Sequence, residues 1–228
     1  MTLVHLGQIL NYGSANGILS FIRELKKDYL NQHMILANER SWLRHSDRNL
    51  QKLFDLGVRV RMVESTFFRE PWNLDSLRAA LSSLHRRHSP SLFLTHGGFS
   101  ALACKSEGIP FQHICHGFGM NRPVWMDEQD RNGIAGAHKV VAVSRDIRSQ
   151  LLKIGIDEQK IEVAYYPLRP HSKLAPKKGP IREIAMIGNL VPLKGQKLGI
   201  DTFHALHLKN PNLRLHVYGD GQIGRAHV

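Results

Sequence analysis

The sequence has no long hydrophobic run. Its longest apolar stretches, such as residues 139–143, are far too short to span a bilayer, which takes about 20 apolar residues. We expect no secretory leader, because the sequence enters the strand-like run Leu3–Leu6 at once. Cysteine is also scarce, and Cys104 and Cys115 both lie among apolar residues, so we expect buried free thiols and no disulfide. These features predict a cytoplasmic protein.

Acidic residues are few relative to basic ones. The chain has 19 Asp and Glu against 31 Lys and Arg, which gives a net charge of +12 and indicates an anionic partner. Zinc-finger spacing, an RNA-binding aromatic signature and a lone basic tail are all missing, so nucleic acid is not expected as a partner. The positive charge is spread along the chain, which favours nucleotide diphosphates and acidic lipid headgroups.

Motifs for metal or covalent chemistry are missing as well. The chain contains no Asp-x-Asp pair and no Gly-x-Ser-x-Gly segment. His113 and His116 stand three apart on a predicted strand, so they point to opposite faces and do not form a metal site with Cys115. We therefore expect neither a metal nor another cofactor, and Ser144 is explained as a helix N-cap.

Short apolar runs alternate with helical patterns from one end of the chain to the other, which is typical of a parallel α/β sheet. The strands are predicted at residues 3–6, 33–37, 58–63, 91–95, 111–115, 139–143, 184–187 and 213–218. The helices are predicted at residues 18–29, 75–88, 98–107, 145–154 and 196–208.

Four prolines between Pro167 and Pro180 interrupt this alternation and predict an interdomain linker. The domains are then residues 1–168, a linker at 169–182 and a second domain at 183–222. That second domain holds a single βαβ unit, which cannot bury both faces of its strands. We therefore expect the second domain to be incomplete.

Two glycine-containing loops follow predicted strands and precede predicted helices. In the first, Gly13 and Gly17 flank Asn16, and the pattern fits either a cradle for a phosphate or sugar hydroxyl, or an ordinary tight turn. In the second, residues 188–195, Lys194 stands just before a helix start, where a cation can neutralise a diphosphate. Phosphate binding is favoured there over a solvated lysine.

Histidines follow two of the predicted strands. His96 and His116 stand at carboxyl ends of strands, where open α/β sheets bind their ligands, although a histidine bonded to nearby backbone is the commoner case. The helix at 75–88 ends in several basic residues. It fits either a contact with anionic lipid or a solvated helix end with cations near the negative dipole end, and the second is favoured.

The order of these motifs resembles the retaining glycosyltransferases of family 4. The matching segments are Gly13–Gly17, Leu94–Gly97, Gly108–Pro110 with His116–Gly117, Val141–Ser144, Ile187–Gly188 with Lys194–Gly195, and Tyr218–Gly221. The resemblance implies a GT-B fold, with an acceptor-side Rossmann-like domain, a donor-side Rossmann-like domain and no metal. It implies transfer of a sugar from a nucleotide-sugar to a glycan or lipid-linked acceptor. The basic composition separately suggests a peripheral contact with anionic membrane.

The resemblance also implies roles for individual residues. Lys194 matches the lysine that contacts the donor diphosphate, and His116 matches the histidine near the transferred sugar, which makes it the catalytic candidate. The remaining donor-binding candidates are Gly13, Gly17, Gly188, Asn189 and Gly195, and the acceptor-side candidates are Asn16 and His96.

Three departures from the family pattern bear on activity. Asn189 stands where members usually carry arginine, Ala164–Leu168 replaces an Asn-Gly turn, and the Glu-x₇-Glu element that holds the donor is absent. Residues 223–228 match one reading frame of a sequencing-library adapter, so we expect a non-native tail on a C-terminally truncated enzyme with little or no turnover. The alternatives are a non-catalytic nucleotide- or saccharide-binding module and a GT-B nucleotide-sugar epimerase.

Overall fold

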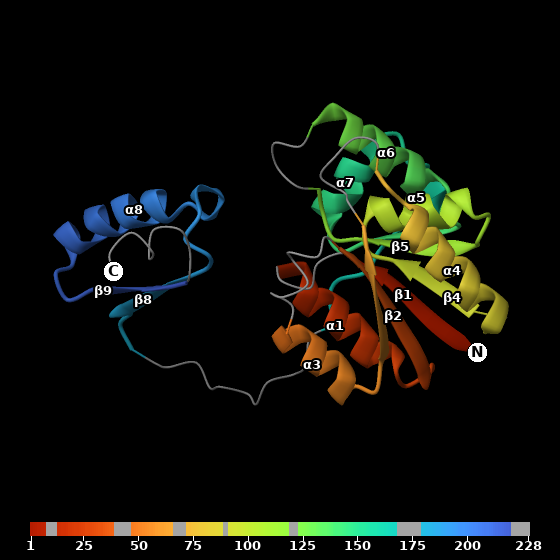
Figure 1. Cartoon of the computed structure of the whole chain (residues 1–228). Helices are drawn as coiled ribbons and strands as arrows, with labels where there is room; N and C mark the ends of the chain where they lie inside the picture. Colours follow the sequence, from red (N-terminus) through yellow and green to blue (C-terminus); the bar gives the residue numbers. More distant parts are fainter. Residues whose placement is uncertain are drawn as a thin grey trace. The chain divides into compact units, whose positions relative to one another are not determined.

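The computed structural model of the chain describes residues 1–7, 13–38, 47–65, 72–88, 91–118, 123–167 and 179–219. The chain divides into two compact units, Met1–Arg169 (unit 1) and Pro170–Val228 (unit 2) (Figure 1). Most of the predicted linker and the whole of the predicted tail at 223–228 lie outside the described residues.

Unit 1 is built on a parallel sheet whose strand order is β3-β2-β1-β4-β5-β6-β7. The strands are β1 Thr2–Gly7, β2 Asn31–Asn38, β3 Arg59–Glu64, β4 Ser91–Thr95, β5 Phe111–Cys115, β6 Lys139–Ala142 and β7 Ile161–Val163. The chain adds strands on one side of β1 and then, from β4 onward, on the other side. The reversal creates a switch point at the carboxyl ends of β1 and β4, where sheets of this kind bind ligands.

Helices cover both faces of this sheet. They are α1 Gly13–Leu25, α3 Asp47–Asp55, α4 Asp75–Arg87, α5 Gly98–Ser106, α6 Val124–Ala135 and α7 Arg145–Lys153, with a short 3₁₀ helix at Glu158–Lys160. Alternate residues of β2 show the two layers: Met34 and Leu36 pack with α1 and α3, while Ile35 and Ala37 join the core formed with α4 and α5. This alternation follows from the two-residue period of a strand.

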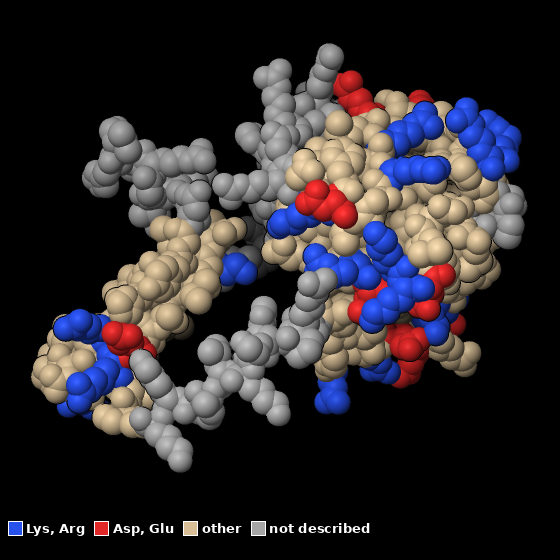
Figure 2. Space-filling view, turned by 90° about the horizontal axis from the view of Figure 1, so that it is seen from below, with Lys and Arg blue, Asp and Glu red and all other residues tan. Residues whose placement is uncertain are grey.

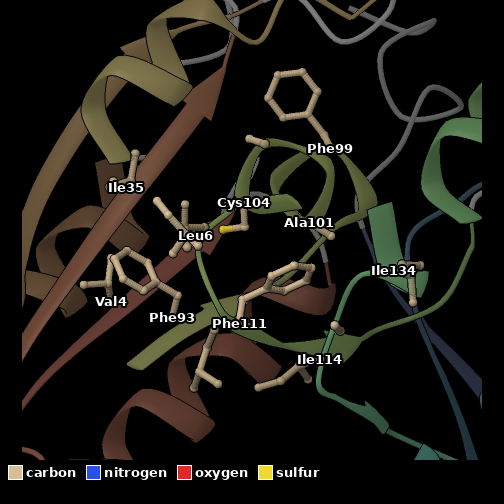
Figure 3. Packing of buried hydrophobic residues seen from close by; sticks show 14 of the residues in the cluster. Val4, Leu6, Ile35, Phe93, Phe99, Ala101, Cys104, Phe111, Ile114 and Ile134 are labelled. Atoms are coloured by element: carbon tan, nitrogen blue, oxygen red, sulfur yellow. The ribbon is translucent and has the colours of Figure 1, made fainter. Parts of the chain in front are cut away.

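The main core lies between the sheet and α4 and α5, and Phe93 and Phe111 lie in it on neighbouring strands in register (Figure 3). Cys104 and Cys115 are buried and free, as the sequence predicts. Burial raises the pKa of the Cys104 thiol, so this cysteine behaves as a small apolar side chain.

Unit 2 contains β8 Glu183–Ile187, the 3₁₀ helix η2 Pro192–Lys194, α8 Gln196–Lys209 and β9 Arg214–Tyr218, with β8 and β9 paired in parallel. None of its described residues is buried, and Ile187 and Leu198 are 80% and 72% exposed. A βαβ unit alone therefore leaves its apolar side chains in contact with water.

The predicted strands and helices all occur, with ends that differ by a few residues. The Ser144 cap is confirmed, because its Oγ accepts a hydrogen bond from the Ile147 backbone N–H at 3.2 Å. The loop predicted at Gly13–Gly17 is wrong, because α1 begins at Gly13 and these residues form its first turns. The helices α3 and α6 and the strand β7 were not predicted.

Candidate functional site

A row of polar side chains runs from near the start of β2 to the carboxyl edge of the unit 1 sheet. Two of its members come from the strands β2 and β1, two follow the ends of β4 and β5, and one follows β7. In spatial order they are Gln32, His5, His96, His116 and Tyr166. We call this set the histidine chain. It begins in the interior, where His5 is fully buried, and ends at the half-buried Tyr166.

Each member of the histidine chain is hydrogen-bonded to the next. The Gln32 Oε1 to His5 Nε2 distance is 3.0 Å, and the His5 Nδ1 to His96 Nε2 distance is 3.1 Å. His96 Nδ1 lies 2.9 Å from His116 Nε2, and His116 Nδ1 lies 2.7 Å from the Tyr166 hydroxyl. These are ordinary hydrogen-bond lengths.

The amide of Gln32 determines where each proton of the chain lies. Its Nε2 donates to the backbone carbonyls of Ile22 and Tyr29, at 3.1 and 3.2 Å, so Oε1 must face His5 as an acceptor. His5 therefore donates from Nε2 and accepts at Nδ1.

The same assignment passes along the rest of the chain, because each neutral imidazole has one donor and one acceptor nitrogen. His96 donates from Nε2 to His5, and His116 donates from Nε2 to His96. His116 Nδ1 is then an acceptor, and the Tyr166 hydroxyl donates to it. All donors point inward, so the outer end of the chain offers acceptors.

The three imidazole rings form a nearly flat ribbon. The planes of His5 and His96 differ by 17° with centroids 5.4 Å apart, and those of His96 and His116 differ by 26° at 5.2 Å. With nitrogens in hydrogen-bond contact, these separations place the rings edge to edge. Their nitrogens face one another and do not converge on a point, and no group suited to hold a metal ion occurs among the described residues.

Burial keeps these histidines neutral. It lowers the pKa of His5 and of His116 to about 4. It also lowers the pKa of His96 well below its usual value, and the neighbouring His116 and His5 act in the same direction. A protonated ring would place two N–H donors opposite each other in the chain, so the hydrogen-bond pattern and the lowered pKa values agree.

Tyr166 also packs on the start of α1. A Cβ on Gly17 would lie 2.1 Å from Tyr166 Cε1, and the Phe21 ring meets the Tyr166 ring edge-on with centroids 5.9 Å apart. Only glycine fits at position 17 with Tyr166 in this place. The structure thus brings Gly17, His96 and His116 together, whereas Asn16 lies on the exposed side of α1.

Gly13 is the first residue of α1, so its backbone belongs to a helix N-terminus with free N–H groups. Such a terminus favours an anion through both hydrogen bonding and the helix dipole. The anion-binding capacity predicted for this segment therefore comes from a helix start and not from a preceding loop.

The predicted donor-binding residues of unit 2 gather at the carboxyl end of β8. Gly188 has a φ of 159° and Gly195 a φ of 66°, which are backbone conformations that favour glycine. The Gln196 amide donates to the Asn189 carbonyl at 2.6 Å, which ties the loop to the first turn of α8. Lys194 is exposed, and its Cγ would lie 3.7 Å from a Cβ placed on Gly188, so the lysine side chain runs beside this glycine. A cation and a helix N-terminus thus occur together, and this combination suits a phosphate.

Three members of the histidine chain were not predicted from the sequence. His5 and Gln32 lie inside strands, where they resemble ordinary alternation of side chains. Tyr166 was noted only as part of a departure from the family turn at residues 164–168. The signal that could have identified His5 is a polar, titratable residue close to the carboxyl end of the otherwise apolar first strand.

Comparison with known proteins identifies the family of the chain. The model of Glycosyltransferase Family 4 matches residues 12–170. This match spans most of the chain, so the chain belongs to Glycosyltransferase Family 4. No curated protein matches the chain significantly.

Several solved structures share the fold. Anabaena HepE in complex with UDP and glucose has a TM-score of 0.71 at 16% identity, over 98% of this chain and 62% of that one. The lipopolysaccharide outer core galactosyltransferase WaaB has a TM-score of 0.63 at 20% identity, over 97% and 62%. The UDP-GlcNAc 2-epimerase from Neisseria meningitidis bound to UDP-GlcNAc has a TM-score of 0.59 at 15% identity, over 95% and 65%.

These likenesses establish an α/β, GT-B type fold with a Rossmann-like sheet, as the sequence predicts. The chain spans less than two thirds of the length of each of these three proteins. No helix among the described residues combines the length and the apolar character that crossing a membrane requires.

The contact between Gly17 and Tyr166 predicts a strong coupling between the two positions. Gly17→Ala should lower the free energy of unfolding by about 1–3 kcal/mol, because the new methyl group overpacks the Tyr166 ring. In a Tyr166→Ala background the same change should be neutral or stabilising, since alanine favours helix. Urea unfolding of the four proteins measures the coupling, and an equal cost of Gly17→Ala in both backgrounds would contradict the packing described here.

The neutral histidines predict a loss of stability in mild acid. Between pH 6.5 and about 4, an unfolded chain protonates His5 and His116 while the folded chain does not, so acid favours unfolding. Stability should be greatest above pH 6.5 and should fall by up to about 1.4 kcal/mol per pH unit for each such histidine. Urea unfolding between pH 7 and 5 measures this slope, and a flat profile would show that the histidines are not held neutral.

Proposed function

We propose that this protein is a retaining glycosyltransferase that moves a sugar from a nucleotide-sugar donor to a glycan or lipid-linked acceptor. The observation that carries the proposal is the histidine chain, in which His96 lies at the switch point of the sheet, in a protein of Glycosyltransferase Family 4. UDP or UDP-sugars in the solved structures of HepE and of the Neisseria epimerase support this class of donor.

His116 is the proposed catalytic residue, and it acts by orienting the transferred sugar. Its Nε2 is engaged by His96, so Nδ1 is the position that can accept a hydrogen bond from a sugar hydroxyl. Tyr166 holds that position here, and a donor hydroxyl takes it over when the tyrosine swings away. A neutral acceptor at this point orients the sugar by accepting a hydrogen bond from one of its hydroxyl groups, and it does not protonate the substrate.

Charge stabilisation is assigned to the donor-side residues. As the bond between the sugar C1 and the diphosphate oxygen breaks, negative charge grows on the leaving diphosphate. Lys194 and the free N–H groups at the start of α8 stabilise that charge, with Gly188, Asn189 and Gly195 shaping the loop around it. The acceptor oxygen forms the new bond to C1, and its proton passes to an oxygen of the leaving phosphate.

Gly13 and Gly17 at the start of α1 are proposed to approach the donor phosphate, and Asn16 and His96 to lie on the acceptor side. The chemistry needs no metal in this scheme, because lysine and helix termini supply the positive charge. The enzyme acts in the cytoplasm, and a lipid-linked acceptor would bring it to the inner face of the membrane.

We also propose that these 228 residues turn over donor slowly or not at all. The chain spans 62% of HepE and of WaaB, and no described residue of unit 2 is buried. A donor-side unit without a core does not hold a substrate rigidly, and catalysis depends on rigid positioning.

A nucleotide-sugar epimerase is the second candidate, because UDP-GlcNAc 2-epimerases are among the solved structures with this fold. The described part of the histidine chain offers imidazoles, an amide and a phenol, and no carboxylate for acid–base work at a sugar carbon. Incubation with UDP-GlcNAc alone separates the two: an epimerase forms the C2 epimer without acceptor, whereas a glycosyltransferase leaves the donor configuration unchanged.

The role of Lys194 is tested by binding of UDP. Lys194→Ala should weaken the affinity about tenfold, the loss of one charge-assisted hydrogen bond. The matched control is Lys197→Ala, which removes one charge from the same helix region where Lys197 pairs with Asp201 at 2.8 Å in full exposure to solvent. This control should retain the affinity of the unchanged chain.

Isothermal titration calorimetry measures the three affinities. Equal weakening by both substitutions would point to a general charge effect and would remove Lys194 from the donor site. No UDP binding by the unchanged chain would contradict the nucleotide-sugar proposal for these residues.

A further inference from the structure

A second cluster of basic side chains lies away from the histidine chain. It lines a hollow of about 180 Å³ formed by β2, β3 and the end of α4. Its polar lining residues are His33, Arg59, Arg61, Ser83, Arg87 and His88. We call this feature the basic hollow. The end of α4 was noted in the sequence for its cations, but the two arginines of β3 were not connected with it.

The fold explains why these side chains meet. In β3, Arg59 and Arg61 alternate with Val60 and precede Val63, which is buried in the core formed with α4. A strand places every second side chain on one face, so both arginines lie on the face that α4 covers. His33 stands in register with Arg59 on β2 and adds its imidazole to the same side.

The basic hollow lies at the amino edge of the sheet, opposite the outer members of the histidine chain, His96 and His116. Arg59 is the first residue of β3 and His33 is near the start of β2, whereas His96 and His116 follow carboxyl ends. α4 runs antiparallel to the strands, so its last turn, with Arg87, returns to the amino end. The basic hollow and the pair His96 and His116 therefore lie at opposite ends of the parallel strands.

Among the described residues, no carboxylate neutralises the charge of the basic hollow. No Asp or Glu is among its described lining residues, and none of the three arginines forms an ion pair with a described residue. The pKa of His33 is lowered, mainly by burial and also by the positive charge of the neighbouring His88 and Arg59. The His33 and His88 rings are 4.9 Å apart, so two imidazoles and three guanidinium groups face one small space.

Another hollow of unit 1 shows the contrast. It is lined by Arg131 and Lys153 together with Asp127 and Glu128, so its cations face an equal number of carboxylates. Figure 2 likewise shows lysine and arginine side chains in separate groups, several of them beside carboxylates. Among the described hollows, the basic hollow is therefore the one in which several cations face one another without a carboxylate.

We propose that the basic hollow binds a phosphate group, carried either by a small phosphorylated compound or by an anionic lipid headgroup. Guanidinium groups match a phosphate through paired N–H donors, and three of them from two elements can surround one. The Ser83 hydroxyl and the imidazoles supply further donors. The volume accommodates one phosphate group with room for a bridging water.

The test uses the full 228-residue chain and inorganic phosphate in a phosphate-free buffer, followed by calorimetry. The unchanged chain should show saturable one-to-one binding, and Arg59→Gln combined with Arg61→Gln should weaken it by at least about tenfold. The control, Arg131→Gln combined with Lys153→Gln, also removes two positive charges, but from the hollow that contains carboxylates. It should change the affinity less than about twofold.

A third variant, Arg87→Gln, approaches the basic hollow from α4 and should weaken phosphate binding as well. All of these side chains are exposed, so circular dichroism should show folded proteins throughout. Absence of saturable binding by the unchanged chain, or equal weakening by the two double variants, would overturn the proposal.

Vesicles distinguish the two sources of phosphate. Sedimentation with phosphatidylglycerol vesicles is compared with sedimentation with phosphatidylcholine vesicles. Binding to anionic vesicles that is lost in the Arg59/Arg61 double variant but kept in the control variant assigns the hollow to a lipid headgroup. Binding of free phosphate without such vesicle binding assigns it to a small phosphorylated compound. If the Arg59/Arg61 double variant keeps both vesicle binding and phosphate binding, the hollow binds neither source of phosphate and the proposal is contradicted.

Discussion

The hydrogen bonds of one side-chain amide set the direction of the whole histidine chain. Gln32 donates to the backbone carbonyls of Ile22, in α1, and of Tyr29, which follows that helix, and this leaves only its oxygen for His5. Each imidazole beyond it then has a single allowed tautomer, up to the nitrogen of His116 that faces Tyr166. A glutamine 27 residues away from His5 in sequence thereby defines the hydrogen-bonding character of the proposed catalytic residue.

This arrangement explains how a strongly basic protein keeps an uncharged site. The chain carries a net charge of +12, yet the members of the histidine chain are neutral groups that are hydrogen-bonded to one another in a row. A buried polar network of this kind is tolerated because every member is satisfied, and a single unpaired nitrogen would be costly. In the proposed scheme, the positive charge for an anionic donor comes from Lys194, which is exposed to water, and from helix N-termini.

The strands and most helices could be predicted from the sequence, because apolar runs and helical periodicity are local signals. The helix α6 was not, since its residues VWMDEQDRNGIA carry a weak apolar pattern, and α3 was not, since it lies in a charged segment. The start of α1 was misplaced because glycines at a helix start resemble a loop. Here Gly17 is required by a ring that belongs to residue 166.

The candidate site was predictable only in part, because some of its members are marked by local signals and others only by contacts between distant residues. His96 and His116 stand at strand ends, which is a local signal, and the structure joins them directly. His5, Gln32 and Tyr166 take part through contacts between residues 27 to 91 positions apart, which no local pattern contains. The tautomers depend on all of these contacts together and therefore emerge only from the folded chain.

The central claim is that the three imidazoles are neutral and share one proton direction. Nitrogen-15 NMR of the histidine side chains measures it directly, because protonated and unprotonated ring nitrogens have distinct chemical shifts. The account predicts that at pH 7 His5, His96 and His116 each carry a proton on Nε2 and none on Nδ1. A proton on Nδ1 of His116, alone or together with one on Nε2, would contradict it.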